Sequence, residues 1–212
     1  YGIVMREAAL AEGVPGGYPS VYPALRTMEE NGWARRGMFV AGLGAAQFAM
    51  GTAVDMLRSL RADPDAPEAV HLASTDPANP YGAVLAWPHE EGVGHGMARA
   101  SGASVVLVNG RLAAFLRRGN PALRVFLPEN EPERGKCARA LAQCLAAVAI
   151  RRQTKRTGLL IGTLDDAPAR EHPLARYLED VGFVATSFGF QMRRLYSAPI
   201  PEAAEVETEE PA

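Results

Sequence analysis

The sequence contains no apolar run of the roughly 18 residues that a membrane-spanning helix needs, so we expect no membrane contact. Cysteine is scarce: the 212 residues include two, Cys137 and Cys144, seven positions apart in a helical pattern. This spacing puts both thiols on one helix face as buried small hydrophobes and favours neither a disulfide nor a metal site. No signal segment follows Tyr1, and we expect a cytoplasmic protein.

The sequence also lacks the glycine-rich loop ending in Gly-Lys-Ser/Thr with which ATP-hydrolysing motors hold phosphates. Its only Gly-Lys pair is followed by Cys137, and Asn130 stands where the first glycine belongs. The spacing of His89 and His95 is wrong for two ligands on one helix turn. We therefore expect no ATP hydrolysis, no metal and no cofactor in this chain.

Charge is distributed unevenly along the chain, whose formal net charge is −2. Five glutamates and no basic residue fall within residues 202–210, so we expect a disordered acidic tail over residues 197–212. Without these five, 22 basic residues face 19 acidic ones. This mildly basic remainder is compatible with nucleic-acid binding but does not by itself indicate it.

Residues 1–60 have the pattern of a partial winged helix. Helices are expected over Val4–Glu12 and Ser20–Asn31, the second capped by Ser20 with Pro23 in its first turn. A strand over Trp33–Val40 and its return through Ala41–Phe48 would form the wing. The first helix would lie upstream of Tyr1, so we expect the chain to be cut from a longer protein. Such units contact DNA or protein, and both alternatives stay open.

Residues 69–196 are expected to form a β-rich second module, after a short helix over Val54–Leu60 and an Asp/Pro-rich linker. Asn109-Gly110 between two β-favouring runs predicts a two-residue hairpin turn. The other expected elements are strands over Val70–Ala73, Leu123–Leu127, Leu159–Ile161, Phe183–Thr186 and Phe190–Arg194, and helices over Arg134–Gln153 and Pro173–Val181. The sequence thus predicts an α+β fold: a partial winged helix, then a small antiparallel β-sheet or barrel with covering helices.

Arginines and lysines gather at two places, the hairpin end and the last turns of the long helix. We expect these residues to neutralise phosphates of nucleic acid: Arg117, Arg118, Arg151, Arg152, Lys155 and Arg156. The alternative is a solvated helix end whose positive charges complement the helix dipole.

The segment DPANPYG, residues 76–82, is the best candidate site by residue type. Asp76 could act as a general base or stabilise a cation, Asn79 could read a base edge, and Tyr81 could stack on a base. The alternative is a structural turn between strands, because Asp-Pro and Asn-Pro commonly begin turns.

Four segments of the sequence resemble the C-terminal region of bacterial Lhr-type ("large helicase-related") helicases, and they follow that family's order. They read REAALAEGVPGGYPSVYPALRTMEENGWARRGMFVAGLGAAQFA, TDPANPYGAVLAWP, SVVLVNGRLAAFLRRG and HPLARYLEDVGFVATSFGFQMRR. The resemblance implies a superfamily 2 ATP-dependent DNA helicase whose motor, with its ATP and Mg, lies upstream. It further implies an extension of winged helices and a β-rich module, associated with homo-oligomers and, in some members, with uracil removal from DNA.

The order of the β-rich segments is also similar to AlkZ/YcaQ-type winged-helix DNA glycosylases. The glutamine-centred catalytic motif of those enzymes is not matched, since Gln47 in GAAQF departs from it. An enzyme would need a carboxylate or amide near the sugar of a flipped nucleotide. Asp76 is the first candidate, with Asp165 and Asp166 behind it.

Three functions follow as hypotheses. The first is an accessory helicase domain that binds or positions DNA in repair, in contact with upstream domains and with other copies of itself, in the cytoplasm near the nucleoid. The second is a DNA glycosylase module for uracil excision. The third is an oligomerisation domain that binds only protein.

Overall fold

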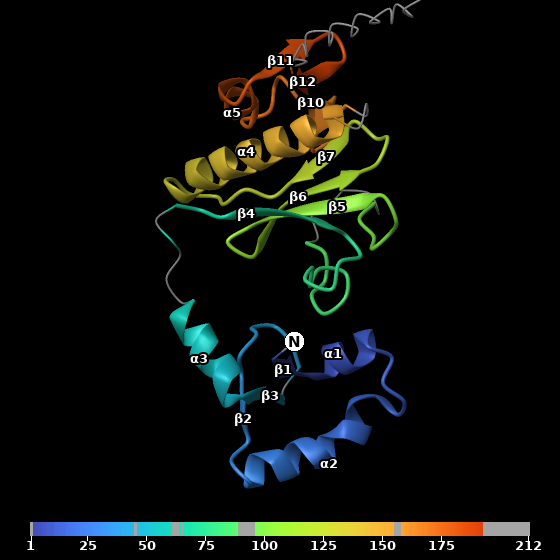
Figure 1. Ribbon diagram of the computed structural model, residues 1–212, viewed down its shortest axis with the longest axis vertical. Helices are drawn as coiled ribbons and strands as arrows, with labels where there is room; N and C mark the ends of the chain where they lie inside the picture. Colours follow the sequence, from blue (N-terminus) through green and yellow to red (C-terminus); the bar gives the residue numbers. More distant parts are fainter. Residues whose placement is uncertain are drawn as a thin grey trace, which may run out of the picture.

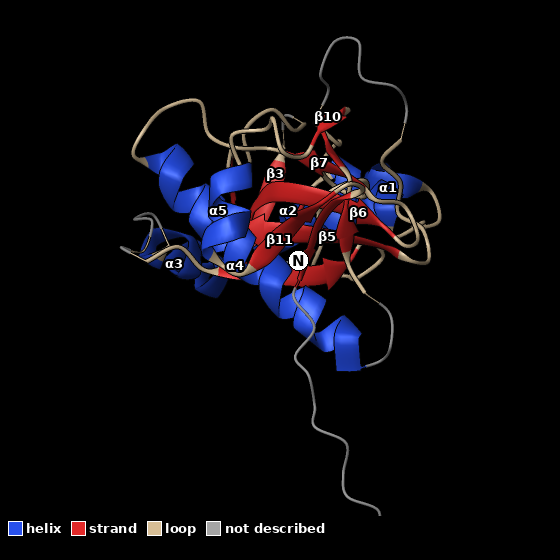
Figure 2. Cartoon of the chain, turned by 90° about the horizontal axis from the view of Figure 1, so that it is seen from above, coloured by secondary structure: helices blue, strands red, loops and turns tan. Residues whose placement is uncertain are grey.

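The computed structural model describes residues 2–44, 46–60, 64, 66–88, 96–154 and 158–192. Its elements are stacked along one long axis (Figure 1). The winged-helix region lies at one end, a six-stranded sheet and its long helix lie in the middle, and a small sheet lies at the other end. Viewed along that axis, the strands gather towards the middle of the outline (Figure 2).

The N-terminal region is a winged helix built on a three-stranded antiparallel sheet. The sheet has the order β1-β3-β2, so that β3 lies between the other two strands. Its elements are β1 (Ile3–Val4), α1 (Arg6–Ala11), α2 (Gly17–Glu30), β2 (Ala34–Gly37), β3 (Gln47–Met50) and α3 (Gly51–Ser59). A small apolar core of residues from β1, α1, β3 and α3 holds this region together.

Two details of this region differ from the prediction. Ile3 and Val4 form a strand paired with β3 instead of opening the first helix, which begins at Arg6. Helix α2 begins at Gly17, so Ser20 is not its cap, and the Ser20 hydroxyl donates instead to carbonyl oxygens of the preceding turn. Pro23 therefore lies within the helix and not in its first turn.

The rest of the described chain is α+β. A six-stranded sheet has the order β10-β9-β7-β6-β5-β4, and a three-stranded sheet has the order β11-β12-β8. Every pairing is antiparallel except that of β7 with β9. The strands are β4 (Ala69–Ala73), β5 (Ala103–Val108), β6 (Arg111–Arg117), β7 (Ala122–Val125), β8 (Leu160–Ile161), β9 (Thr163–Leu164), β10 (Ala167–Pro168), β11 (Phe183–Thr186) and β12 (Gly189–Met192). Neither sheet closes among the described residues, so the predicted sheet is correct and the barrel alternative is wrong.

Different elements pack on the two faces of the large sheet. Helix α4 (Glu133–Thr154) and helix α5 (Ala175–Asp180) pack with the small sheet on one face, around a core that includes Leu116, Leu141 and Phe190. On the other face Phe115 packs with partly buried aromatic and aliphatic side chains. Neighbouring residues of a strand point to opposite faces, which explains why Phe115 and Leu116 belong to different cores.

The predicted hairpin between β5 and β6 is confirmed. Asn109 and Gly110 both have left-handed backbone angles, with φ of 48° and 76°. A second tight hairpin, β9–β10, was not predicted. Asp165 and Asp166 form its turn with φ of 50° and 66°.

One described loop connects the two regions. Residues 74–88 leave the end of β4, cross the face of the large sheet opposite α4 and approach the winged helix (Figure 1). Val84, in this loop, is 8% exposed and packs in the core of the winged helix with Ile3 and Val54. No helix among the described residues combines the length and apolarity required to cross a bilayer.

A candidate nucleic-acid interface

The predicted site, residues 76–82, is stabilised by hydrogen bonds among the polar groups of its own loop. Asn79 is 1% exposed, and its amide nitrogen donates to the carbonyl oxygens of Ser74 (2.8 Å) and Tyr81 (3.3 Å). Its amide oxygen accepts the backbone N–H of Tyr81 at 3.1 Å. Asn79 therefore presents no free edge to a base in this arrangement and acts as the buried centre of a turn.

Arg99, which the sequence patterns did not single out, stabilises this loop through hydrogen bonds from a neighbouring segment. Its guanidinium donates to the carbonyl oxygens of Asn79 (2.7 Å) and Thr75 (3.1 Å), and more weakly to those of Asp76 and Tyr81. A single arginine thus satisfies several loop carbonyls at once. A lone arginine in a loop carries no sequence signal for this role, because its partners are backbone atoms.

Tyr81 lies against the sheet and not in solvent. Its ring stacks on Trp87, with centroids 6.3 Å apart, and its hydroxyl accepts the backbone N–H of Leu112 at 3.1 Å. Trp87 in turn packs edge-on against Phe115. The aromatic that was predicted to stack on a base therefore stacks on protein.

Asp76 sits at the exit of β4, half-buried, and accepts the backbone N–H of Ala78 at 2.8 Å. This bond closes a local turn, as the alternative interpretation of Asp-Pro proposed. Strand register places Asp76 at the same end of the sheet as the predicted arginines. Ala73 of β4 pairs with Ser104, and the neighbouring Ala103 pairs with Arg117.

At this end of the sheet, Arg117 and Arg118 turn to opposite faces. Arg117 lies on the face of Phe115, where its guanidinium donates to the carbonyl oxygen of Gly96. Arg118 follows the last residue of β6, and Arg152 lies in the last turn of α4. Burial, and secondly the charge of Arg118, lower the pKa of Arg152.

His71, in β4, also lies near the end of α4. Burial lowers its pKa, and the charges of Arg152 and Arg151 lower it further. Its Nε2 atom is buried and has no hydrogen-bond partner among the residues that the structure describes. The charges of Arg151 and Arg152 at the end of α4 therefore act on a side chain of β4 as well. The predicted Lys155 and Arg156 lie outside the described residues.

On the other face, a cavity of about 150 Å³ opens beside Arg117. Its polar lining comprises Arg117, Asn120, Arg124 and Asp166. Arg124 pairs with Asp166 through Nη2 at 2.5 Å, while its Nη1 is buried without a partner in the described part of the chain.

The two aspartates of the β9–β10 turn have different surroundings. Asp165 accepts the backbone N–H of Val125 at 2.8 Å and lies 3.3 Å from Nε2 of His172, so its carboxylate is engaged in the fold. Asp166 is 71% exposed and contributes to the cavity. Among the described residues no three histidines, cysteines or carboxylates lie close enough to hold a metal.

Residues 1–69 match the family model described as "Large helicase-related protein, winged-helix domain". The chain is 46% identical over 151 residues to a "Lhr helicase/ probable uracil glycosylase" of Mycolicibacterium smegmatis, which covers 69% of this chain and 10% of that protein. It is 34% identical over 192 residues to the "Lhr helicase/uracil glycosylase" of Escherichia coli, covering 89% of this chain and 12% of that protein.

This chain belongs to the large helicase-related (Lhr) family. It spans only about a tenth of the length of these two curated Lhr relatives. The resemblance predicted from sequence segments is thereby confirmed.

The Lhr winged helix shows less positive charge than the sheet end. Helix α2, which follows the turn in the helix-turn-helix order, carries one arginine and two glutamates. Arg26 pairs with Glu30 at 3.2 Å, and Arg36 of β2 pairs with Glu29 at 2.9 Å. These ion pairs partly neutralise the arginines of this part of the Lhr-family chain.

Proposed function

We propose that this chain is a non-motor accessory module of an Lhr-type helicase that binds and positions DNA. The observation that carries the proposal is the placement of arginines from separate elements at one end of the large sheet, where Arg117 ends β6 and Arg151 and Arg152 lie in the last turn of α4. Arginine side chains gathered on one surface can neutralise successive phosphates of a nucleic-acid strand.

Arg117 extends this positive region around the end of the sheet to the opposite face, where Arg124 is paired with Asp166. A strand of nucleic acid could therefore follow the sheet end from α4 to the cavity, with phosphates on Arg118 and Arg152 first. In this arrangement the winged helix would hold the module against neighbouring protein domains.

The parent protein would supply the remaining activities. The two relatives are named as helicases and as uracil glycosylases or probable uracil glycosylases, and we extend both activities to the parent as proposals. We propose that residues 1–60 form a partial winged-helix module and that residues 69–196 form a β-rich α+β module. Residues 197–212 would be an acidic tail. The ATP and Mg site would lie in the motor, the location would be cytoplasmic near the nucleoid, and the protein would form homo-oligomers.

The test is the salt dependence of DNA affinity for the 212-residue chain, measured by fluorescence anisotropy with single-stranded and duplex oligonucleotides. Arg118→Gln with Arg152→Gln removes two phosphate contacts. We expect the slope of log K against log salt to become shallower by about 1.8 for duplex DNA. The matched control is Arg26→Gln with Arg58→Gln, which removes two exposed arginines of the winged helix.

An unchanged slope in the Arg118/Arg152 variant would contradict the phosphate site. A chain that shows no salt-dependent affinity for DNA, yet forms a defined oligomer in sedimentation, would support the purely protein-binding alternative.

Uracil excision is the second candidate, and the cavity beside Asp166 favours it. A carboxylate next to a small cavity with arginine and amide donors could stabilise a developing positive charge on the sugar or orient water. Asp76, the first candidate from the sequence, is not among the described residues that line this cavity. We therefore propose Asp166 ahead of Asp76 for this role.

Incubation of the chain with uracil-containing DNA, followed by alkali, tests this second function. We expect strand breaks that Asp166→Asn abolishes and that the control Asp55→Asn, on an exposed helix, leaves unchanged. If Asp76→Asn abolished the breaks and Asp166→Asn did not, the assignment to Asp166 would be wrong. Intact DNA with the unmodified chain would exclude excision by this chain.

A further inference from the structure

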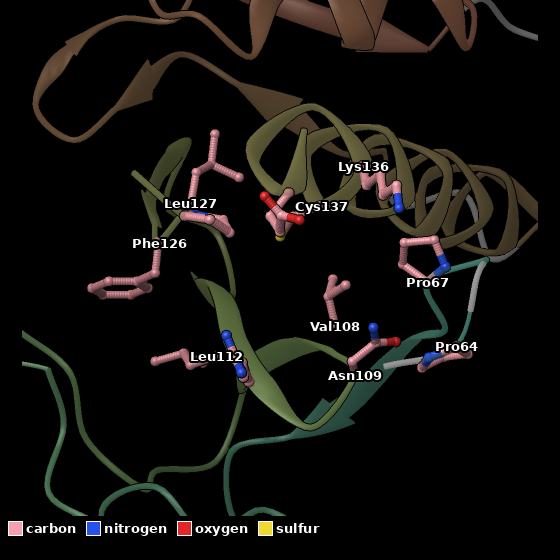
Figure 3. Close-up of a pocket in the computed structure, with 12 residues that line it drawn as sticks. Pro64, Pro67, Val108, Asn109, Leu112, Phe126, Leu127, Lys136 and Cys137 are labelled. Carbon is pink, nitrogen blue, oxygen red and sulfur yellow. The ribbon is translucent and has the colours of Figure 1, made fainter. Parts of the chain in front are cut away.

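A second and larger cavity lies at the opposite end of the large sheet. It has a volume of about 310 Å³ and opens between the linker, the β5–β6 turn and the start of α4 (Figure 3). In the close-up, Pro64 and Pro67 face Lys136 and Cys137 of the helix across this space. The volume is at the lower end of the range for small-molecule sites, about 300 to 1,000 Å³.

The walls of this cavity are mainly apolar and its charges are mainly positive. Val108, Leu112 and Leu127 contribute aliphatic surface, together with the linker prolines. The charged side chains among its lining residues are Arg111, Lys136 and Glu133, which leaves one net positive charge. Such a combination of apolar walls and a few charged groups is typical of small-molecule sites.

The backbone at the start of α4 is already satisfied. Gly135 N–H donates to the Glu131 carboxylate at 3.0 Å, and Lys136 N–H donates to the carbonyl oxygen of Pro132 at 3.1 Å. An anion in this cavity would therefore depend on the side chains of Arg111 and Lys136 and not on free helix N–H groups.

Arg111 and Cys137 both line this cavity. Burial raises the pKa of Cys137, and the charge of Arg111 acts against this rise. The guanidinium, the thiol and Lys136 thus share one space. Cys144 lies seven residues further along α4, is half-buried like Cys137, and is not among the residues that line the cavity.

We propose that this cavity binds one unpaired nucleotide of a DNA strand, with the base among the apolar walls and the phosphate on Arg111 and Lys136. This inference rests on the proposed function and adds a second contact to it. Lys136 and Arg152 are separated by about 24 Å along the helix at about 1.5 Å per residue, so the two contacts are distinct.

The alkylation rate of Cys137 reports directly on whether a ligand occupies the cavity. The 212-residue chain is treated with iodoacetamide, and the alkylation rates of Cys137 and Cys144 are followed separately by mass spectrometry. Thymidine 5′-monophosphate at about ten times its dissociation constant should slow alkylation of Cys137 by about tenfold. The rate at Cys144 should stay unchanged. Thymidine and inorganic phosphate, each at the same concentration, should protect Cys137 less.

Variants separate this cavity from the rest of the surface. Arg111→Gln with Lys136→Gln should abolish the protection by thymidine monophosphate. Arg139→Gln, one turn further along α4 and stacked over Tyr177, is the matched control and should leave the protection unchanged. Circular dichroism of each variant establishes that it folds.

The outcomes distinguish the two proposals. If thymidine monophosphate fails to protect Cys137 while the chain binds DNA through Arg118 and Arg152, the cavity proposal is wrong and the proposed function stands. If the protection occurs but the chain has no salt-dependent DNA affinity, the proposed function fails and the nucleotide site stands. Protection by a glutamate-rich peptide, and not by the nucleotide, would overturn the inference in favour of a protein-binding site.

Discussion

Gln47 shows how one buried side chain can organise the wing of this winged helix. It is 0% exposed, and its amide oxygen accepts the backbone N–H groups of Phe39 and Val40, both at 2.8 Å. Its amide nitrogen donates to the carbonyl oxygen of Val40 at 2.8 Å. The glutamine that departs from the glycosylase motif is therefore a structural residue in this wing.

Replacing Gln47 with leucine should destabilise the chain by about 3 kcal/mol, because it leaves buried backbone groups without partners. Urea unfolding measures the change. The control is Gln143→Leu, on an exposed position of α4, where we expect less than about 0.5 kcal/mol. Equal effects of the two substitutions would show that the Gln47 hydrogen bonds do not stabilise the wing.

His71 makes stability depend on pH. Because burial and two arginines lower its pKa in the folded state, the unfolded chain binds a proton more readily. The stability from neutral His71 is fully present above the unfolded pKa, about 6.5. It is lost as pH falls from there through the lower folded value.

Unfolding free energies between pH 7.5 and 5 should therefore decline more steeply for the unmodified chain than for His71→Gln. The comparison with the variant isolates His71 from the carboxylates, which both proteins share. Parallel pH profiles would contradict a neutral, buried His71.

Individual side-chain roles were the least predictable part of the site. Residue type correctly marked Asp76, Asn79 and Tyr81 as a structured segment, but amide and phenol groups suit ligand and backbone equally well. The partners of Asn79 lie within its own loop, and those of Tyr81 come from Trp87 and β6. Sequence alone cannot decide which partner prevails, because the choice depends on how the loop crosses the sheet.

At the scale of elements, the lack of a side chain at Gly189 allows β12 to approach β8 closely enough to pair with it. Its φ is 123°, and a Cβ atom would lie 2.2 Å from the carbonyl oxygen of Ile161. Gly189→Ala should therefore destabilise the chain by about 3 kcal/mol or more, since backbone must move.

Gly110 is the matched comparison. Its φ is 76°, but a Cβ atom there would meet open space, so Gly110→Ala should cost only about 1 kcal/mol of left-handed strain. Thermal unfolding of both variants measures the difference. A cost for Gly189→Ala no greater than that for Gly110→Ala would show that the small sheet adjusts freely at β12.

Elements with strong local signals were predicted well. The Asn109-Gly110 turn specifies its own backbone angles, and the long apolar stripe of α4 identifies a helix without tertiary information. Strands β1 and β9 have only two residues each and exist through pairing with distant strands. Such short segments have no period to detect, which is why both were missed.

At the scale of the whole molecule, Val84 connects the two regions. A charge at this buried position would disrupt the core of the winged helix without touching the core under α4. Val84→Asp should accelerate hydrogen exchange in α1 and α3 by about tenfold or more, and leave β5 and β6 protected. Val184→Asp, at an exposed position of β11, should change neither region. Uniform acceleration across the chain would mean that the two regions unfold as one unit.

The overall class, a winged helix followed by an α+β region, was predictable from patterns and family segments. The choice between an open sheet and a barrel was not. It depends on β9 and β10, which extend the sheet beyond β7 at one edge while β4 ends it at the other. Closure is a property of register between distant strands, and no local pattern encodes it.

The parallel pairing of β7 with β9 has a consequence for biosynthesis. Ala122 pairs with Thr163, and all of α4 lies between them in the chain. A ribosome must therefore add the 39 residues from Phe126 to Leu164 after β7 before that strand acquires its second neighbour. Until then the edge of β7 stays open to pairing with other nascent chains, and a chaperone that covers this edge would protect the growing polypeptide during that interval.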